Sequence, residues 1–269
     1  MKCISFKPQC TPECHVDGWI HCVNHSPEML QRMHPAVIIC PGGGYEFLSD
    51  REMDPVAEPF YAAGYNTFVL HYSLGAEAAD LHPLIQLAST VAYIRQNSEE
   101  LFTDTNAVSV CGFSAGGHLA ASLGVFHDDP AFLKAYSLPC NPRPDAMILC
   151  YPVITSDEFA HVGSISTVSG ASVGTETYRW YGLDQHVHAS TPPAFLWHAA
   201  DDTVVPVENT LKFASALSSA NIPFELHILP EGGHGLSVCT SQVDKNLPYN
   251  ARWVQWCIAW LNQQFNFDV

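Results

Sequence analysis

The sequence predicts an α/β fold in which a doubly wound, mainly parallel sheet is covered by helices on both faces. Short apolar runs, typical of strands buried on both faces, alternate along the chain with longer segments of helical pattern. With 269 residues and 47% hydrophobic side chains, the chain is long enough to bury the core of a large domain. We therefore expect one domain over residues 1–269.

The expected strands are short and rich in β-branched and other apolar residues. In chain order they are Val37–Cys40, Thr67–His71, Val108–Cys111, Met147–Cys150, Ala194–His198 and Glu225–Leu229. The expected helices between them are Pro55–Ala63, Leu84–Asn97, Gly116–Phe126, Glu208–Ala220 and Ala251–Phe265. This alternation is typical of a parallel sheet. The connection 151–193 mixes Ser, Gly, Thr and His, and its length predicts a lid or cap.

One expected strand runs directly into a serine flanked by glycines. Residues 108–118 read VSVCGFSAGGH, which places the pattern G-x-S-x-G between a β-branched strand and a helix rich in Ala, Gly and Leu. This is the context that a nucleophile elbow requires. Gly112 and Gly116 leave room for the strand and the helix to approach each other. We therefore predict that Ser114 is a catalytic nucleophile.

Two later segments supply an acid and a histidine, in the chain order Ser, Asp, His. The strand 194–198 runs into the acidic pair Asp201 and Asp202, and the strand 225–229 ends in a glycine-flanked loop that carries His234. Such a loop can bring His234 over Ser114, while an aspartate orients the imidazole. The sequence thus predicts a Ser-His-Asp triad.

A glycine run follows the first of these apolar strands. Residues 36–45 read AVIICPGGGY, and the glycines allow backbone N–H groups to converge. Acyl transfer needs such donors for the oxyanion of its tetrahedral intermediate. A phosphate-binding loop is the alternative, but no Lys-Ser/Thr follows the glycines, and the spacing is not G-x-G-x-x-G. We expect an oxyanion hole here.

Together these segments resemble the α/β-hydrolase esterases and lipases with a G-F-S-A-G-G-H elbow, which include cytosolic acetyl esterases grouped with xylan-degrading enzymes. The likeness spans most of the chain. It is carried by residues 41–45, 112–118, 191–198, 202–206 and 232–235.

The resemblance assigns roles to single residues. The superfamily pattern H-G-x-x-D-x-x-V-P, aligned from His198, places the triad acid on Asp202 rather than Asp201, although Ala199 stands where glycine is usual. The corresponding loop of related lipases reads H-G-G-G, with proline replacing the histidine here. The carried-over oxyanion donors are the N–H groups of Gly43, Gly44 and Ala115.

The resemblance also implies an activity, that of a serine carboxylesterase forming an acyl-enzyme on Ser114. The expected substrates are small-molecule esters with short acyl groups, acetyl first, on a carbohydrate or similar alcohol. Neither a metal nor an organic cofactor is required. Tyr45, Tyr72 and Trp180 are the expected substrate contacts, although Trp180 can equally be a packing anchor of the lid. For His118 we expect a structural role.

Two other classes of protein stay open as alternatives. Serine peptidases of the prolyl-oligopeptidase type share the elbow and the D-x-x-V-P turn, but they usually carry a large propeller. This chain has no blade-length repeats and no room for one. The other alternative is an inactive hydrolase-fold binding protein, and the complete triad argues against it.

The net charge of the chain limits the classes of molecule that we expect it to bind. The formal net charge of −16 opposes binding to nucleic acids and to anionic membranes, so we expect neutral substrates. The chain has no apolar run of about 18 residues, and its first residues lack the apolar region of a signal peptide. These features predict a cytoplasmic location.

The ten cysteines do not predict a disulfide framework in a chain of this size. Cys40, Cys111, Cys150 and Cys257 lie in apolar segments and should be small buried hydrophobes. A set of metal-ligand residue types lies near the N-terminus and comprises Cys3, Cys10, Cys14, His15, His21, Cys22 and His25. This set lacks the paired C-x-x-C of zinc sites, so we expect an antiparallel edge hairpin, with zinc as the alternative.

Overall fold

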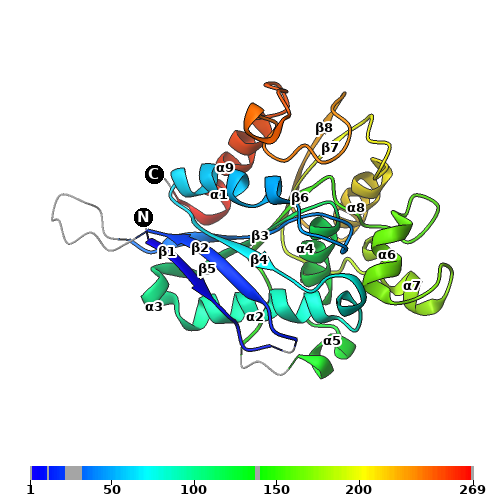
Figure 1. Cartoon of the computed structure of the whole chain (residues 1–269), viewed down its shortest axis with the longest axis horizontal. Coiled ribbons are helices and arrows are strands. Elements are labelled where there is room, and N and C mark those ends of the chain that lie inside the picture. The colour runs from blue at the N-terminus through cyan, green and yellow to red at the C-terminus, as the bar shows by residue number, and fades with distance from the viewer. Residues whose placement is uncertain (1, 11, 22–31, 137–139, 268–269) are drawn as a thin grey trace.

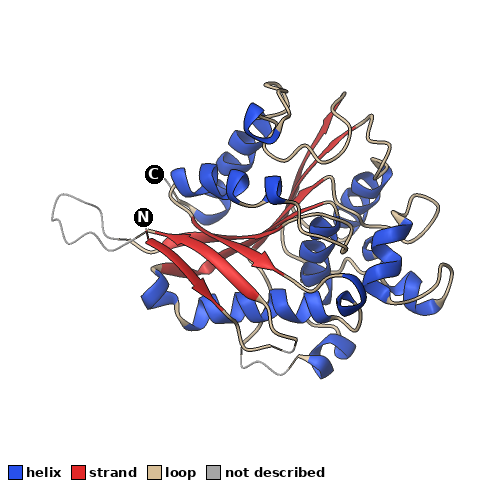
Figure 2. Ribbon diagram, in the orientation of Figure 1, coloured by secondary structure: helices blue, strands red, loops and turns tan. Residues whose placement is uncertain are grey.

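A computed structural model describes residues 2–10, 12–21, 32–136 and 140–267. Within them, eight strands form one twisted sheet between layers of helices (Figure 1, Figure 2). The strands are β1 (Lys2–Phe6), β2 (His15–Ile20), β3 (His34–Cys40), β4 (Asn66–His71), β5 (Thr103–Phe113), β6 (Ala146–Cys150), β7 (Ala194–Ala199) and β8 (Phe224–Leu229). The sheet confirms the predicted fold class.

The strand order is β1-β2-β4-β3-β5-β6-β7-β8. Strands β3 to β8 pair in parallel, whereas β1 pairs antiparallel with β2, and β2 pairs antiparallel with β4. The N-terminal strands thus form the antiparallel edge hairpin that the sequence predicts. Because β3 to β8 are parallel, their carboxyl ends meet at one edge of the sheet, which is where open α/β sheets bind ligands.

Helices cover both faces of the sheet (Figure 1). The helices α1 (Asp54–Ala62) and α9 (Arg252–Phe265) pack on one face and share a core with the inner side chains of β3 and β5. The opposite face carries α2 (His82–Gln96), α4 (Ala115–Phe126) and α8 (Glu208–Ser219). These five helices lie where the sequence predicts them, with ends that differ by at most two residues.

Shorter helices connect these elements. They are α3 (Ser98–Leu101), α5 (Pro130–Ala135) and the 3-10 turns η1 (Asp50–Glu52), η2 (Gly75–Ala78), η3 (Leu183–Gln185) and η4 (Ser241–Val243). The connection 151–193, which the sequence predicts as a lid or cap, contains α6 (Val162–Ser169) and α7 (Glu176–Trp180). Both lie on the side of the molecule that carries α4 and α8 (Figure 1).

The central helix α4 fixes the position of the residue that precedes it. All twelve of its residues are buried, and its glycines and alanines allow close packing against the sheet. A Cβ atom on Gly112 would lie 2.0 Å from the carbonyl oxygen of Gly116, so only glycine fits at this crossing of strand and helix. Ser114 is therefore held in a tight turn between two buried elements.

Four cysteines that the sequence predicts as buried hydrophobes are fully buried, namely Cys40, Cys111, Cys150 and Cys257. The nine cysteines in the described residues are all free thiols. In the same residues, no helix is both long and apolar enough to cross a lipid bilayer.

Candidate active site

Ser114 occupies the turn between β5 and α4, with φ of 53° and ψ of −117°. A residue other than glycine is strained there, and the surrounding structure must hold it. Its N–H donates a 3.0 Å hydrogen bond to the carbonyl of Cys150, and its own carbonyl accepts from the N–H groups of His118 and Val153. The strained serine is thus anchored to β6 and to the first turn of α4.

His234 lies in the loop that follows β8. Its Nε2 atom is 2.9 Å from Oγ of Ser114, and its Nδ1 atom is 2.6 Å from Oδ2 of Asp202. The ring of Tyr151 packs edge-on against the imidazole, with centroids 5.1 Å apart. The structure therefore brings Ser114, His234 and Asp202 into one continuous hydrogen-bonded line.

The two adjacent aspartates reach different parts of the histidine loop. Asp202 contacts the imidazole, whereas Oδ1 of Asp201 accepts a 2.9 Å hydrogen bond from the N–H of Gly233. Asp202 is almost fully buried, while Asp201 is exposed. The geometry therefore favours Asp202 as the partner of His234, which is the residue that the sequence pattern selects.

Asp202 is surrounded by hydrogen-bond donors. Its Oδ1 atom accepts from the N–H groups of Val204 and Val205, at 2.9 and 3.0 Å. Burial by itself would raise the pKa of Asp202, but hydrogen bonds from His198 and His234 outweigh burial and hold that pKa well below its ordinary value. Asp202 is therefore ionised at neutral pH.

His198 is a contact that sequence reasoning missed. It is fully buried, and its Nε2 atom lies 3.1 Å from Oδ2 of Asp202 and 3.0 Å from the carbonyl oxygen of Val205. Because both neighbours are acceptors, Nε2 carries the proton, and Nδ1 accepts from the hydroxyl of Thr210 at 2.7 Å. The spacing H-x-x-x-D at a strand end was the available signal.

The glycine loop after β3 turns back beside Ser114. Gly43 has φ of 127°, and a Cβ atom there would lie 2.0 Å from the carbonyl oxygen of Phe47, so the turn requires glycine. The carbonyl of Gly43 accepts from the N–H groups of Glu46 and Phe47. Within the described part of the chain, the N–H groups of Gly43 and Gly44 have no protein acceptor.

A cavity of about 350 Å³ opens in front of Ser114 and His234. It is walled by the glycine loop, by η1, by the start of α6 and by the turn after β7. Its lining residues are Gly43, Gly44, Glu46, Phe47, Ser49, Arg51, Glu52, Ser114, His161, Gly163, Thr167, Val204 and His234. The volume is at the lower end of the range that small-molecule sites occupy.

Several known proteins are similar in sequence to this chain. A family model described as BD-FAE matches residues 25–147. Endo-1,4-beta-xylanase B of Butyrivibrio fibrisolvens is 37% identical over 209 residues, which are 77% of this chain and 33% of the xylanase. The acetylxylan esterase of Xylanibacter ruminicola is 30% identical over 215 residues, which are 76% of this chain and 42% of that esterase. The chain thus spans less than half the length of these two relatives.

A solved structure extends the match to nearly the whole chain. The acetyl ester-xyloside bifunctional hydrolase of Caldicellulosiruptor lactoaceticus is 35% identical, with a TM-score of 0.81 over 95% of this chain and 89% of that one. The chain belongs to the α/β-hydrolase esterase family. The resemblance that the sequence motifs indicated is thereby confirmed, and the fold of that structure is similar to the one described here.

Two predicted substrate contacts of this hydrolase lie behind the glycine loop and outside the cavity. Tyr45 is fully buried and donates a 2.9 Å hydrogen bond to Nδ1 of His118, while the hydroxyl of Tyr72 donates to the carbonyl of Pro41 at 2.5 Å. Burial lowers the pKa of His118 to about 4, so its ring is neutral, and its Nε2 donates to the carbonyl of Tyr181. The prediction for Tyr45 and Tyr72 is corrected: both tyrosines brace the loop.

The third predicted contact, Trp180, also lies away from Ser114. Its ring stacks on Phe126 of α4 with centroids 4.0 Å apart, and it lines a separate hollow together with Leu81 and Tyr181. Of the two roles that the sequence left open, the structure gives Trp180 that of a packing anchor. The part of the 151–193 connection that reaches the cavity is α6 with its N-cap, through His161, Gly163 and Thr167.

Those N-terminal cysteines and histidines that the structure describes do not gather into one site. Within the described residues, Cys10 and Cys14 are close, with sulfur atoms 3.4 Å apart, while Cys3 is exposed. His21 stacks between His34 and Tyr61. Of the other members of the predicted set, His15 lies on β2, whereas Cys22 and His25 lie outside the described residues.

Proposed function

We propose that this hydrolase is a serine carboxylesterase that cleaves short acyl esters, acetyl esters first, of carbohydrates or similar small alcohols. The observation that carries the proposal is the line from Oγ of Ser114 through His234 to Asp202, with distances of 2.9 and 2.6 Å. It lies beside a glycine loop whose Gly43 and Gly44 N–H groups have no acceptor among the described residues. This arrangement suits nucleophilic acyl transfer.

The first half-reaction forms an acyl-enzyme. Nε2 of His234 takes the proton of the Ser114 hydroxyl while Oγ attacks the ester carbonyl carbon, and a C–O bond forms. The carbonyl oxygen becomes an oxyanion, which the N–H groups of Gly43, Gly44 and Ala115 stabilise. His234 then gives its proton to the departing alkoxide, and the alcohol leaves.

In the second half-reaction water replaces the alcohol. His234 removes a proton from a water molecule, the resulting hydroxide attacks the acyl carbon, and the same donors hold the second oxyanion. The bond to Oγ breaks as His234 returns the proton to Ser114, and the carboxylic acid leaves. The ionised Asp202 stabilises the imidazolium that forms in both halves.

The lining of the cavity supports a polar alcohol and a short acyl group. Glu46, Arg51 and Thr167 present charged and hydroxyl groups that can hydrogen-bond to sugar hydroxyls. Phe47 and Val204 are the large apolar side chains of the lining. Two of the relatives are named for acetylxylan or acetyl ester-xyloside hydrolysis. These names and the polar groups in the lining support the same substrate class.

The start of α6 forms one wall of the cavity, which supports a lid role for part of the 151–193 segment. The hydroxyl of Thr167 donates a 2.8 Å hydrogen bond to Oε1 of Glu46, joining α6 to the glycine loop. The Nδ1 atom of His161 accepts from the N–H of Ser164 and thereby caps the helix. The wall is thus tied to the same loop that holds the oxyanion donors.

The experiment that tests the function combines labelling and turnover. Wild-type protein should react with a fluorophosphonate probe and hydrolyse 4-nitrophenyl acetate and acetylated xylo-oligosaccharides, and Ser114→Ala should do neither while remaining folded. Ser122→Ala is a matched control, because Ser122 is buried on α4, the helix that follows Ser114, and contacts His118, not His234. Activity of the Ser114→Ala protein at the wild-type level would contradict the proposal.

The same assay separates the two alternatives. A peptide amide panel measured beside the esters identifies a peptidase if amides are cleaved with comparable kcat/KM. A hydrolase-fold binding protein would neither turn over esters nor become labelled.

A further inference from the structure

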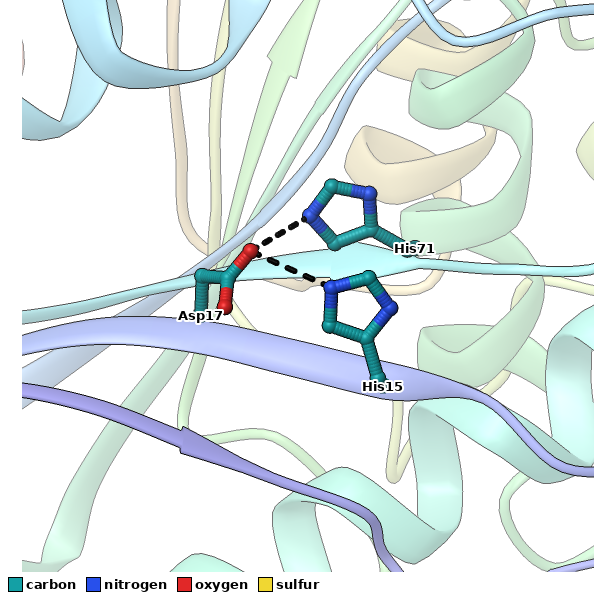
Figure 3. A group of neighbouring side chains, drawn as sticks. All are labelled: His15, Asp17 and His71. Atoms are coloured by element: carbon teal, nitrogen blue, oxygen red, sulfur yellow. Dashed lines mark hydrogen bonds and ion pairs between the residues drawn. The ribbon is translucent and has the colours of Figure 1, made fainter.

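Three side chains with metal-binding chemistry meet at the junction of the N-terminal hairpin and the parallel sheet (Figure 3). His15 and Asp17 are two residues apart on β2, so both side chains project from the same face of the sheet. His71 is the last residue of β4 and pairs directly with His15 across the antiparallel ladder. Strand alternation and register alone therefore place the three groups together.

The distances among these groups match those between ligands of a small divalent ion. Nε2 of His15 lies 3.2 Å from Oδ2 of Asp17, and Nε2 of His71 lies 3.1 Å from the same oxygen. All three ligand atoms lie within 4.8 Å of one another. Ligands about 2.1 Å from a tetrahedral zinc ion are about 3.4 Å apart, so only small shifts are needed for coordination.

We propose that His15, Asp17 and His71 bind a divalent transition-metal ion of the zinc type. Two imidazole nitrogens and a carboxylate oxygen are among the ligands that zinc prefers, and water can complete the coordination. The bound ion would connect β2 to β4, and so attach the antiparallel hairpin to the parallel sheet. This proposal is independent of the proposed ester hydrolysis.

The two histidine rings must adjust when the ion binds. They are stacked nearly parallel, with an angle of 9° and centroids 4.0 Å apart, so each ring has to tilt to direct its Nε2 atom at a shared ion. The side chains of His15, Asp17 and His71 are 42%, 42% and 26% exposed, which leaves room for this rotation and for the bound water.

The surroundings support a cation at this place. Ser5 on β1 pairs with Asp17, and its hydroxyl hydrogen-bonds the Asp17 carboxylate, which helps to hold that ligand in place. The negative charge of Asp54, at the start of α1, interacts electrostatically with His71. The protein as a whole carries a formal net charge of −16, which attracts cations.

A second histidine and carboxylate group in the described residues is less suited to a metal. His127, Asp128 and His188 also lie close together, but Nε2 of His188 is 3.0 Å from the carbonyl oxygen of Val125 and donates to it. That nitrogen is therefore occupied by its proton. In the group around Asp17, by contrast, both Nε2 atoms point at the carboxylate itself.

Strand β8 provides a matched control. His227 and Glu225 are also two residues apart on one strand, and Nε2 of His227 is 2.8 Å from the Glu225 carboxylate. Its nearest aromatic neighbours are Phe195 and Trp256, so this pair has the histidine–carboxylate spacing without a second imidazole stacked on it. Removing His227 therefore changes a histidine–carboxylate pair without changing the proposed site.

The test is a zinc titration of the full chain after dialysis against a chelator, in a background with Cys10 and Cys14 replaced by serine so that their thiolates do not bind zinc. This background protein should bind zinc, and zinc should raise its Tm because the ion binds the folded state. His15→Gln together with His71→Gln should remove one equivalent of bound zinc and abolish most of the Tm shift. His227→Gln should change neither quantity.

Two results would overturn the proposal. One is a background protein that binds no zinc, and the other is a double variant that binds the same number of ions with unchanged affinity. Hydrolysis of 4-nitrophenyl acetate and the circular dichroism spectrum check that each variant is folded. Should the double variant fail to fold, Asp17→Asn keeps both rings and removes the charged ligand, and it should also lose one equivalent of zinc.

Discussion

The hydroxyl of Tyr151 donates a 2.7 Å hydrogen bond to Oε1 of Glu52, a residue 99 positions away in the sequence. The other oxygen of Glu52 accepts the N–H of Gly42 at 2.8 Å, and the Tyr151 oxygen accepts the N–H of Ser237 at 2.7 Å. One buried network therefore joins the glycine loop, the end of β6 and the loop that carries His234.

Replacing Glu52 tests whether this network positions the proposed oxyanion donors. Glu52→Ala should lower kcat about 10- to 100-fold, because a shift of the glycine loop by a fraction of an ångström misplaces the donors. Glu52→Gln should keep most of the activity, since its oxygen can accept from Gly42 and its NH₂ group can donate to Tyr151. Steady-state kinetics with 4-nitrophenyl acetate measures both, and equal losses in the two variants would contradict a positioning role.

Glu52→Gln should also change how the free energy of unfolding depends on pH. Burial raises the pKa of Glu52, against the opposing effect of the hydrogen bonds from Tyr151 and Gly42. With a folded-state pKa above the unfolded value of about 4.3, Glu52 contributes stability at low pH that is lost as the pH rises through the folded-state pKa.

Glu52→Gln does not titrate, so its free energy of unfolding relative to wild type should increase from about pH 4 to about pH 8. Urea unfolding of both proteins across this range measures the difference, in which titrations common to both proteins cancel. A difference that is independent of pH would show that the Glu52 carboxyl titrates alike in the folded and unfolded states.

The adjacent aspartates should differ sharply in their effect on turnover. Asp202→Asn should lower kcat by about 10⁴-fold, because the imidazolium loses the charge that stabilises it and His234 loses its tautomer control. Asp201→Asn should be close to wild type, since an amide oxygen can still accept the N–H of Gly233. Comparing kcat of the two variants is the measurement, and the reverse ranking would assign the triad acid to Asp201.

The cavity predicts a limit on acyl length. For 4-nitrophenyl esters of increasing chain length, kcat/KM should fall beyond about four acyl carbons, because few apolar side chains are available to cover a longer chain. Each additional buried methylene would otherwise contribute about 0.8 kcal/mol to binding. A steady rise of kcat/KM to octanoyl esters would contradict the preference for acetyl groups.

Much of the site was predictable because its motifs are local. Each motif can be recognised within a few residues: a serine between two glycines, an acidic turn after a strand, and a histidine in a glycine loop. The chain order Ser, Asp, His is typical of one fold, the α/β-hydrolase fold. Among those motifs, Ser114, Asp202 and His234 are brought into contact at the positions that the sequence selects.

The supporting residues were not predictable, because their partners are distant in sequence. Glu52 and Tyr151 meet only when the sheet is assembled, and the pairing of His15 with His71 depends on an antiparallel register between β2 and β4. Tyr45 illustrates the opposite error. It follows the glycines directly, but its positive φ of 64° turns the side chain into the core behind the loop.

The hydrogen bond between Ser114 and His234 closes a segment of 120 residues, and the one between Asp202 and His234 closes a segment of 32. Closing long segments is slow, since chain entropy must be lost before the contact forms. The catalytic line therefore exists only once β5, β7 and β8 lie in the same sheet. If Ser114 and His234 act as proposed, ester turnover is for this reason a late and stringent measure of refolding, and a fragment that ends before β8 would lack His234.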